Sequence, residues 1–317
     1  MTSRLLWSVL SAAAITAGTT AGSGRAAIQP ELADRVMKLT RDSSWRLVSS
    51  IPLSFRTFHP QGMVKIGDHF IVSSVEVRVP TRRLPQIVDG HDRDTGEGAG
   101  HLFKIDATGK LVADVTVGEG TVYHPGGIDY DGTNVWVPVA EYRPNSRSII
   151  YRVDPVTMTV TRVFAFDDHI GAIVHATDDR TLHGVSWGSR YFYRWTLDAG
   201  DRVTNTAAAR DRLRTVNPSH YVDYQDCKYA GAQRMLCTGV TEISRATDAS
   251  PFRLGGIDLI DLRDGRPLHQ VPLLLWTATG LDMTHNPAWL EATPTGIRGY
   301  FMPEDDVSKL YIYEVTP

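Results

Sequence analysis

One stretch of this 317-residue chain occurs twice, and it restricts the fold more than any other feature. The copies run from His59 to Glu76 and from His124 to Glu141, and both begin His-Pro-x-Gly. An apolar run, a turn containing glycine and a second apolar run follow in each copy, which is the pattern of a β-hairpin. A hairpin returns the chain to its starting end. We therefore expect the opening histidine and the closing glutamate of each copy to lie at the same end.

The repeat opens a longer unit of four strands, and five such units can be traced along the chain. They begin near positions 59, 124, 169, 223 and 277, and this spacing is typical of propeller blades. The fifth unit ends one strand short, whereas Trp45–Leu53 has the pattern of a last strand and precedes the first unit. The prediction is an all-β fold, a β-propeller of five four-stranded blades closed by that N-terminal strand, with six or seven blades as the alternative. A short helix is expected over Glu31–Leu39.

For four segments the sequence gives more detailed structural predictions. The last strand of the third unit is expected to begin near Arg202, and the first strand of the fifth at Thr279–Met283. The segment His285–Thr295 is expected to be an insertion that covers the opposite end of the fifth blade. Val77–Gly100, rich in Asp, Gly and Arg, is expected to hang over the mouth of the central channel. It is interpreted as an exposed loop, with a lid or a calcium loop as alternatives, because it lacks the EF-hand spacing.

The N-terminus has the pattern of a secretory signal peptide. Arg4 precedes the apolar, small-residue stretch Leu5–Ala17, which is too short to span a membrane, and small residues suited to cleavage follow. Residues 1–26 are therefore predicted to be a signal peptide and residues 27–317 a single propeller domain, periplasmic or extracellular. The net charge of −3, without a basic block, argues against a nucleic-acid partner.

The two cysteines fit an oxidising compartment. Cys227 and Cys237 lie on either side of a turn centred beside Gly231, so they are expected to face each other across two antiparallel strands. A disulfide between them is predicted, with two unpaired buried thiols as the alternative.

Histidines and carboxylates are expected to surround one mouth of the channel. His59, His124 and His169 open three successive blades, which predicts a site for a divalent metal such as Zn, Mn, Fe or Ca. Glu76 and Glu141 close two hairpins at the same end and are predicted to be catalytic, or to orient the histidines. In the structural alternative, the His-Pro-x-Gly motif only shapes the entry to each blade.

The later blades add further candidates at the same position. Asp223 opens the fourth unit and is a third predicted catalytic carboxylate. Gln61, Trp187, His220 and Glu242 are predicted to bind a ligand, since they lie at or beside the same ends of strands. Tyr142 is a further aromatic candidate for a sugar-stacking wall.

Other motifs are interpreted as structural. Gly184–Gly188 matches the Gly-x-Ser-x-Gly pattern of hydrolases, but it ends a strand and opens no helix. His175, His183 and His285 have no repeated partner and are assigned to packing.

The repeated His-Pro-x-Gly hairpins resemble those of secreted propeller proteins grouped as a family of unknown function. The likeness covers the whole mature chain and implies a propeller fold. More distantly, the chain resembles the lactonase and strictosidine-synthase type of propeller and the five-bladed glycosidases. Neither the calcium ligands of the lactonases nor the acidic triad of the glycosidases is matched here residue by residue.

Three classes of function are compatible with the sequence. The first is a secreted hydrolase or lyase that acts on a carbohydrate, ester or lactone at the channel mouth. The second is a binding module for a small molecule, a glycan or a protein partner. The third is a structural propeller without a small-molecule site. A deep, polar mouth with perturbed pKa values would favour the enzyme, and a shallow aromatic one the binding module.

Overall fold

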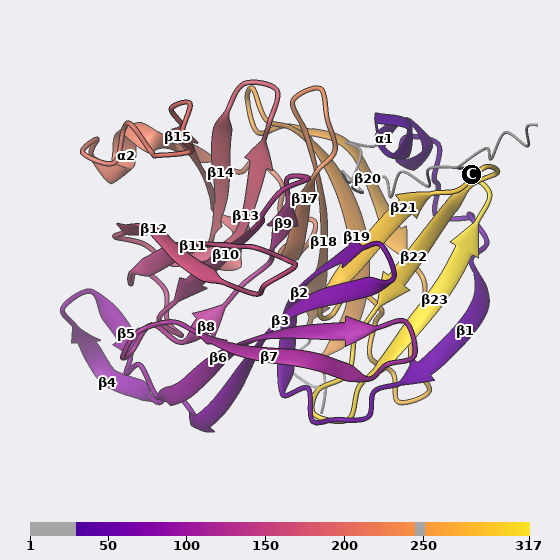
Figure 1. Cartoon of the computed structure of the whole chain (residues 1–317), viewed down its shortest axis with the longest axis horizontal. Helices are drawn as coiled ribbons and strands as arrows, with labels where there is room; N and C mark the ends of the chain where they lie inside the picture. Colours follow the sequence, from indigo (N-terminus) through magenta and orange to yellow (C-terminus); the bar gives the residue numbers. More distant parts are fainter. Residues whose placement is uncertain (1–29, 245–250) are drawn as a thin grey trace, which may run out of the picture.

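The computed structural model describes residues 30–244 and 251–317, and the predicted signal peptide lies outside them. The chain forms five antiparallel blades arranged as a propeller, with few helices (Figure 1). The prediction of an all-β, five-bladed propeller is therefore confirmed. No helix within the described residues is long and apolar enough to cross a membrane.

Each blade has four strands, ordered from the channel outward. Blade one contains β2 (His59–Ile66), β3 (His69–Val79), β6 (Glu97–Asp106) and β7 (Leu111–Val117). Blade two contains β8 (His124–Pro125) and β9 (Asp129–Tyr130), which share the innermost position, then β10 (Val135–Ala140), β11 (Ser148–Val153) and β12 (Val160–Phe166). Blade three contains β13 (Ile170–Ala176), β14 (Thr181–Ser186), β15 (Tyr191–Thr196) and β16 (Arg214–Val216). Blade four contains β17 (Asp223–Tyr229), β18 (Arg234–Ile243), β19 (Phe252–Asp261) and β20 (Pro267–Leu273).

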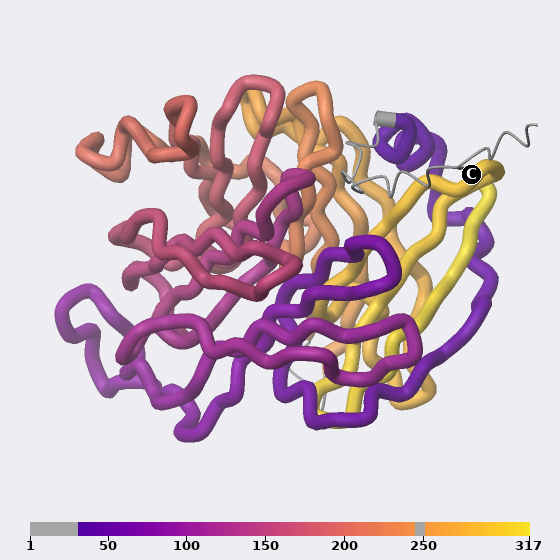
Figure 2. The backbone as a smooth tube through the Cα atoms, viewed as in Figure 1, coloured from indigo at the N-terminus to yellow at the C-terminus, as the bar shows by residue number. Residues whose placement is uncertain are grey.

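Blade five joins the two ends of the chain. It contains β21 (Ala288–Ala292), β22 (Ile297–Phe301), β23 (Lys309–Val315) and, on the outside, the N-terminal strand β1 (Arg46–Pro52). β1 pairs antiparallel with β23, and Figure 2 shows this indigo segment lying beside the yellow C-terminal strand. The predicted closure of the ring is confirmed.

The helices are short. α1 (Pro30–Val36) confirms the expected N-terminal helix and packs Leu32, Ala33 and Val36 into the core shared by blades four and five. α2 (Arg210–Leu213) precedes β16, and the 3-10 helix η1 (Trp187–Ser189) joins β14 to β15.

Two strand predictions were wrong. The first strand of blade five is β21, inside the segment interpreted as an insertion, whereas Thr279–Met283 forms a turn around Gly280. Alanine, leucine and glutamate in β21 favour helix locally, and pairing with β22 overrides that preference. In blade three the last strand is β16 rather than a segment near Arg202, because a turn and α2 intervene.

The segment between β3 and β6 is more regular than an exposed loop. It contains a small hairpin of its own, β4 (Arg83–Val88) and β5 (His91–Arg93). His91 lies with Nδ1 3.3 Å from the main-chain oxygen of Pro144 in blade two. The Tyr123 hydroxyl donates to the main-chain oxygen of Thr95 at 2.7 Å. These contacts hold the hairpin against blade two.

The glycines of the repeated motif let the inner strands touch at the channel axis. Gly127 N donates to Gly171 O at 2.8 Å, and Ile173 N donates to Gly127 O at 3.2 Å, which joins blade two directly to blade three. A Cβ atom on Gly127 would lie 2.8 Å from Gln225 O, and one on Gly62 would lie 2.6 Å from Ile128 N. Only glycine permits this approach, which explains the Gly of His-Pro-x-Gly.

A buried carboxylate spans the same axis. Asp226 on β17 accepts from Met63 N of blade one at 2.8 Å and from Ile128 N of blade two at 3.1 Å. Lys228 contacts the same carboxylate and donates to Ile128 O at 2.7 Å. Blade four is therefore joined to blades one and two by one side-chain network.

The cysteines form the predicted disulfide. Cys227 on β17 and Cys237 on β18 are directly paired residues of adjacent strands, bonded to each other and fully buried.

Candidate functional site

A polar cavity of about 770 Å³ lies at the channel mouth, where the inner strands of the first blades begin. Its size is within the range of small-molecule sites. Eight of the sequence-predicted site residues line it: His59, Gln61, His124, His169, Trp187, His220, Asp223 and Glu242. Tyr142, Arg190 and His285 line it as well.

Glu76 and Glu141 are placed elsewhere. Residues directly opposite in a sheet share a face, and the next residue points to the other face. His59 lies opposite Val75 and His124 opposite Ala140, so both glutamates point away from the histidines. Glu76 accepts from Arg78 at 2.7 Å, and Glu141 accepts from Arg143 at 2.8 Å. Each glutamate lies at the predicted end of its hairpin, but its side chain points away from the histidine that it was expected to contact.

His59 is oriented by a carboxylate from blade five. Its Nδ1 lies 2.8 Å from Asp305 Oδ1, and the same oxygen accepts from Asn286 Nδ2 at 2.9 Å. Burial acts to raise the pKa of Asp305, but the hydrogen bonds from His59 and Asn286 and the nearby histidines together outweigh it and hold that pKa below its usual value. Asp305 is therefore ionised and fixes His59 with its proton on Nδ1.

His124 is buried in the cavity wall. The side chain is 5% exposed and stacks on Tyr142 with ring centroids 4.1 Å apart, and no residue in the described part of the chain hydrogen-bonds to either ring nitrogen. Burial, reinforced by His169 and His59, holds its pKa well below 6.5, so the ring is neutral at pH 7. Buried polar groups are normally paired, and an unpaired one points to a missing ligand, water or ion.

His169 is paired with the backbone. Its Nδ1 lies 2.8 Å from the main-chain oxygen of Glu141, and its ring meets Trp187 edge to face at 4.7 Å. Burial lowers its pKa to about 4. The ring centroid lies 5.9 Å from that of His124.

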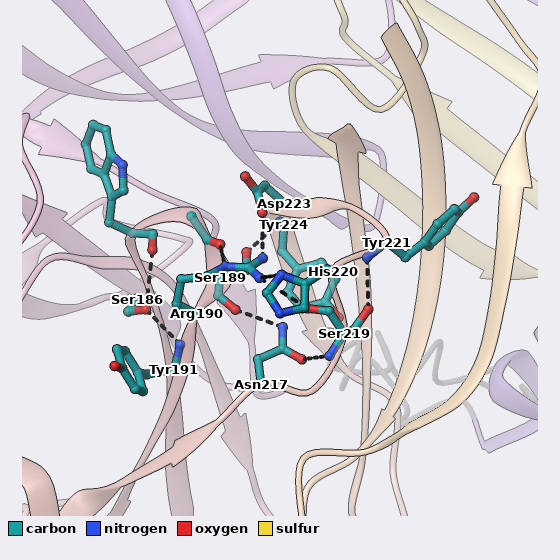
Figure 3. Close-up of polar contacts among 12 residues, drawn as sticks. Ser186, Ser189, Arg190, Tyr191, Asn217, Ser219, His220, Tyr221, Asp223 and Tyr224 are labelled. Atoms are coloured by element: carbon teal, nitrogen blue, oxygen red, sulfur yellow. Dashed lines mark hydrogen bonds and ion pairs between the residues drawn. The ribbon is translucent and has the colours of Figure 1, made fainter. Parts of the chain in front are cut away.

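One wall of the cavity is built around Arg190, which follows η1. Figure 3 shows Arg190 beside His220 and Asp223, with Asn217 and Ser219 drawn below them. Arg190 Nη2 donates to Asp223 Oδ1 at 2.7 Å, and another of its nitrogens contacts the His220 ring. Burial raises the pKa of Asp223, although the Arg190 charge opposes this.

A buried carboxylate, that of Asp282, lies close to His285. Asp282 is fully buried, and its Oδ2 lies 3.9 Å from His285 Nδ1, which is beyond hydrogen-bond range. Burial raises the pKa of Asp282 to about 6 and lowers that of His285. Interpreting His285 as a packing residue was therefore incomplete, since it lines the cavity. No repeat marked it.

Trp187 connects the cavity to the β4–β5 hairpin. The Arg93 guanidinium lies over its ring, 5.4 Å from the centroid, while Tyr142 lies 6.0 Å away on another side. The hairpin of blade one thus reaches the mouth at blade three, as the sequence predicted for this segment.

The residues present do not form a ready metal site. Within residues 30–244 and 251–317, no group of three His, Cys, Asp or Glu side chains is placed to hold a metal ion. His59 and His169 use Nδ1 to bind Asp305 and a main-chain oxygen, which leaves Nε2 of each ring available. This arrangement suits direct proton transfer by imidazoles.

The sequence matches one protein family over residues 22–316, nearly its full length. The chain belongs to DUF6454, a family of unknown function. The resemblance to a propeller family of unknown function is therefore confirmed. No curated protein matches the chain.

Several solved structures align with the chain at low identity. A luciferin-regenerating enzyme aligns with a TM-score of 0.46 and 9% identity, over 87% of this chain and 95% of that one. Hydrazine synthase of Kuenenia stuttgartiensis aligns with a TM-score of 0.37 and 13% identity, over 80% of this chain and 58% of that one. The tail fiber of Staphylococcus aureus phage P68 aligns with a TM-score of 0.44 and 10% identity, over 87% of this chain and 53% of that one. At these values the alignments carry no argument about function.

Proposed function

We propose that this propeller is a secreted hydrolase or lyase that acts on a carbohydrate, ester or lactone in the mouth cavity. The observation that carries the proposal is His124, a buried and neutral imidazole in the cavity wall with neither nitrogen hydrogen-bonded. A buried polar group left unpaired costs about 1–3 kcal/mol. The unpaired imidazole of His124 is best explained by a ligand that forms the missing hydrogen bonds.

The neighbouring groups suit proton transfer. His59 is held by Asp305 in the tautomer whose Nε2 accepts a proton, so it fits the role of general base. His124 can accept or pass on a proton, because it is neutral at pH 7. Asp223 remains the proposed catalytic carboxylate, since it lines the cavity and burial raises its pKa toward the range in which it exchanges protons. Gln61, His220, Trp187 and Glu242 are proposed to contact the substrate from the same wall.

Secretion is supported by the disulfide. Structural disulfides form in oxidising compartments, and Cys227–Cys237 is such a bond. Detection of the protein in the periplasm or culture medium, with residues 1–26 removed, would test this part of the proposal.

The test of the reaction is a substrate screen with matched variants. Nitrophenyl glycosides, nitrophenyl esters and aromatic lactones would be incubated with wild type, with His124→Asn and with His69→Asn. His69 opens β3 at the opposite end of the same type of hairpin, away from the cavity. We expect turnover of at least one class, lost in His124→Asn and kept in His69→Asn. Equal activity in the two variants would contradict the role of His124.

Metal analysis of the purified protein belongs to the same experiment. A stoichiometric divalent ion that disappears in His124→Asn would replace direct proton transfer with metal ligation by His59, His124 and His169.

A non-catalytic binding module is the second candidate. The observation in its favour is the aromatic pair Tyr142 and Trp187 on the cavity wall, a feature of binding surfaces. Saturable binding of a compound that is never turned over, in protein with intact Asp305 and His59, would favour this function over the enzyme.

A further inference from the structure

The hydrogen-bond partners of His59 and His169 outside the cavity determine whether these rings donate or accept inside it. A main-chain carbonyl oxygen can only accept, so His169 must carry its proton on Nδ1 to bind Glu141 O. A neutral ring with Nδ1 protonated has a lone pair on Nε2. His59 follows the same rule, because the ionised Asp305 can only accept. Two imidazoles that line the cavity therefore offer acceptors there.

The charged residues of the cavity wall do not change its preference for ligands that donate hydrogen bonds. Arg190 is the one arginine or lysine among the described lining residues, and it already binds Asp223. The carboxylate of Glu242 is paired with Arg253 at 2.6 Å and is itself an acceptor. Among the described residues, the wall thus has no unpaired permanent positive charge with which to bind a carboxylate or phosphate. An anionic ligand such as a uronate is disfavoured.

Apolar ring faces stand beside these acceptors. Tyr142 and Trp187 both line the cavity, with ring centroids 6.0 Å apart. Trp187 is held in place by Arg93 over its ring and by the edge contact with His169. Aromatic faces next to hydrogen-bond acceptors match a sugar ring, which has C–H groups on its faces and hydroxyl donors around its edge.

We propose that the cavity binds a neutral saccharide, whose hydroxyl groups donate to His59, His169 and Glu242 while its ring packs on Tyr142 and Trp187. This deepens the proposed function by naming the substrate class, and it rests on that function only for turnover. The choice of neutral over anionic sugar comes from the tautomers of His59 and His169 and from the pairing of Arg190.

The test compares matched neutral and acidic sugars. Calorimetric titration at pH 7.5 would use glucose with glucuronate, galactose with galacturonate, and the methyl glycosides of mannose and xylose. We expect at least one neutral sugar to bind, and about tenfold more tightly than its uronate, as expected when an unbalanced carboxylate is buried against acceptors.

Variants identify the site. His169→Ala removes one acceptor and Trp187→Ala removes one ring face, so each should weaken binding by about tenfold, the equivalent of one lost interaction. His69→Ala, at the other end of the molecule, should bind as wild type does. Circular dichroism confirms that each variant is folded, and Trp187→Ala covers the case in which His169→Ala fails to fold.

Three outcomes would overturn the inference. They are the absence of binding by every neutral sugar in the panel, tighter binding of the uronate in each pair, and binding unchanged in both site variants. Turnover of an ester or lactone without any sugar binding would reject the saccharide and leave the proposed reaction class standing. Loss of turnover together with weaker sugar binding in His124→Asn would support both.

Discussion

The Asp226–Lys228 network at the channel axis makes a strong stability prediction. Asp226 is fully buried and binds main-chain N–H groups of two other blades, and Lys228 is its buried counter-charge. Burial raises the pKa of Asp226 and lowers that of Lys228, and the contact between the two groups opposes both shifts. Asp226→Ala removes the acceptor of both N–H groups and leaves the lysine unpaired.

Breaking a buried pair from one side costs about 3–5 kcal/mol, and each unsatisfied N–H group costs about 1–3 kcal/mol if water does not reach it. We expect a loss of about 4 kcal/mol or more, a large fraction of the roughly 5–15 kcal/mol of a typical domain. For a chain of this length, that loss lowers Tm by about 10 °C.

The assay is urea unfolding followed by tryptophan fluorescence, with thermal unfolding as a second measure. Asp264→Ala is the matched control, because Asp264 is an exposed carboxylate that lies 3.7 Å from Arg266 Nε and accepts from the main-chain nitrogen of Arg266 at 3.0 Å. Such exposed pairs contribute about 0–1 kcal/mol. In the double variant Asp226→Ala/Lys228→Met, part of the loss should be recovered, because no unpaired charge remains. If Asp226→Ala costs no more than Asp264→Ala, the network does not hold the blades together and the reasoning is refuted.

Three further predictions concern the axis, the disulfide and pH. Gly126→Ala should give little soluble protein, because its Cβ atom would lie 2.1 Å from Gly171 O. Gly200→Ala is the control and should express normally, since the nearest atom to its Cβ is 3.4 Å away. Equal yields of the two variants would argue against the close approach. Replacing Cys227 and Cys237 with serine should cost about 2–3 kcal/mol in urea unfolding, since the closed loop is short, and alkylation of both thiols in untreated wild-type protein would show that the bond is absent. The pKa of His169 is about 4 when folded against 6.5 for a free side chain, so the unfolded chain takes up more protons and acidification from pH 6.5 toward 4 should reduce stability. His169→Gln should lose less stability over that range, and ring nitrogen NMR showing His169 charged at pH 6 would contradict the assignment.

Much of the fold could be predicted from local pattern. The repeated hairpin, the strand spacing and the missing last strand were sufficient to predict five blades and the closure by β1, because each blade is a local unit. β21 was missed because its residues favour helix, and only its neighbour β22 makes it a strand. The short β16 was missed for a similar reason, since one adjacent strand defines it.

The sequence by itself determined that three histidines reach the channel mouth. His59, His124 and His169 occupy the same position in successive blades, and this repeat alone brings them to one cavity. It also determined the disulfide, since the spacing around Gly231 makes Cys227 and Cys237 opposite residues of a hairpin.

Only the tertiary structure decided what each histidine faces. Asp305 and Asn286 reach His59 from blade five, and the main chain at Glu141 reaches His169 from blade two. These partners lie far from the histidines in sequence and on other blades. The glutamates that share the repeat point away, because a change of one residue along a strand reverses the face. Strand pattern specifies the end at which a side chain lies, whereas its partners and tautomer depend on which blades the closed ring places beside it.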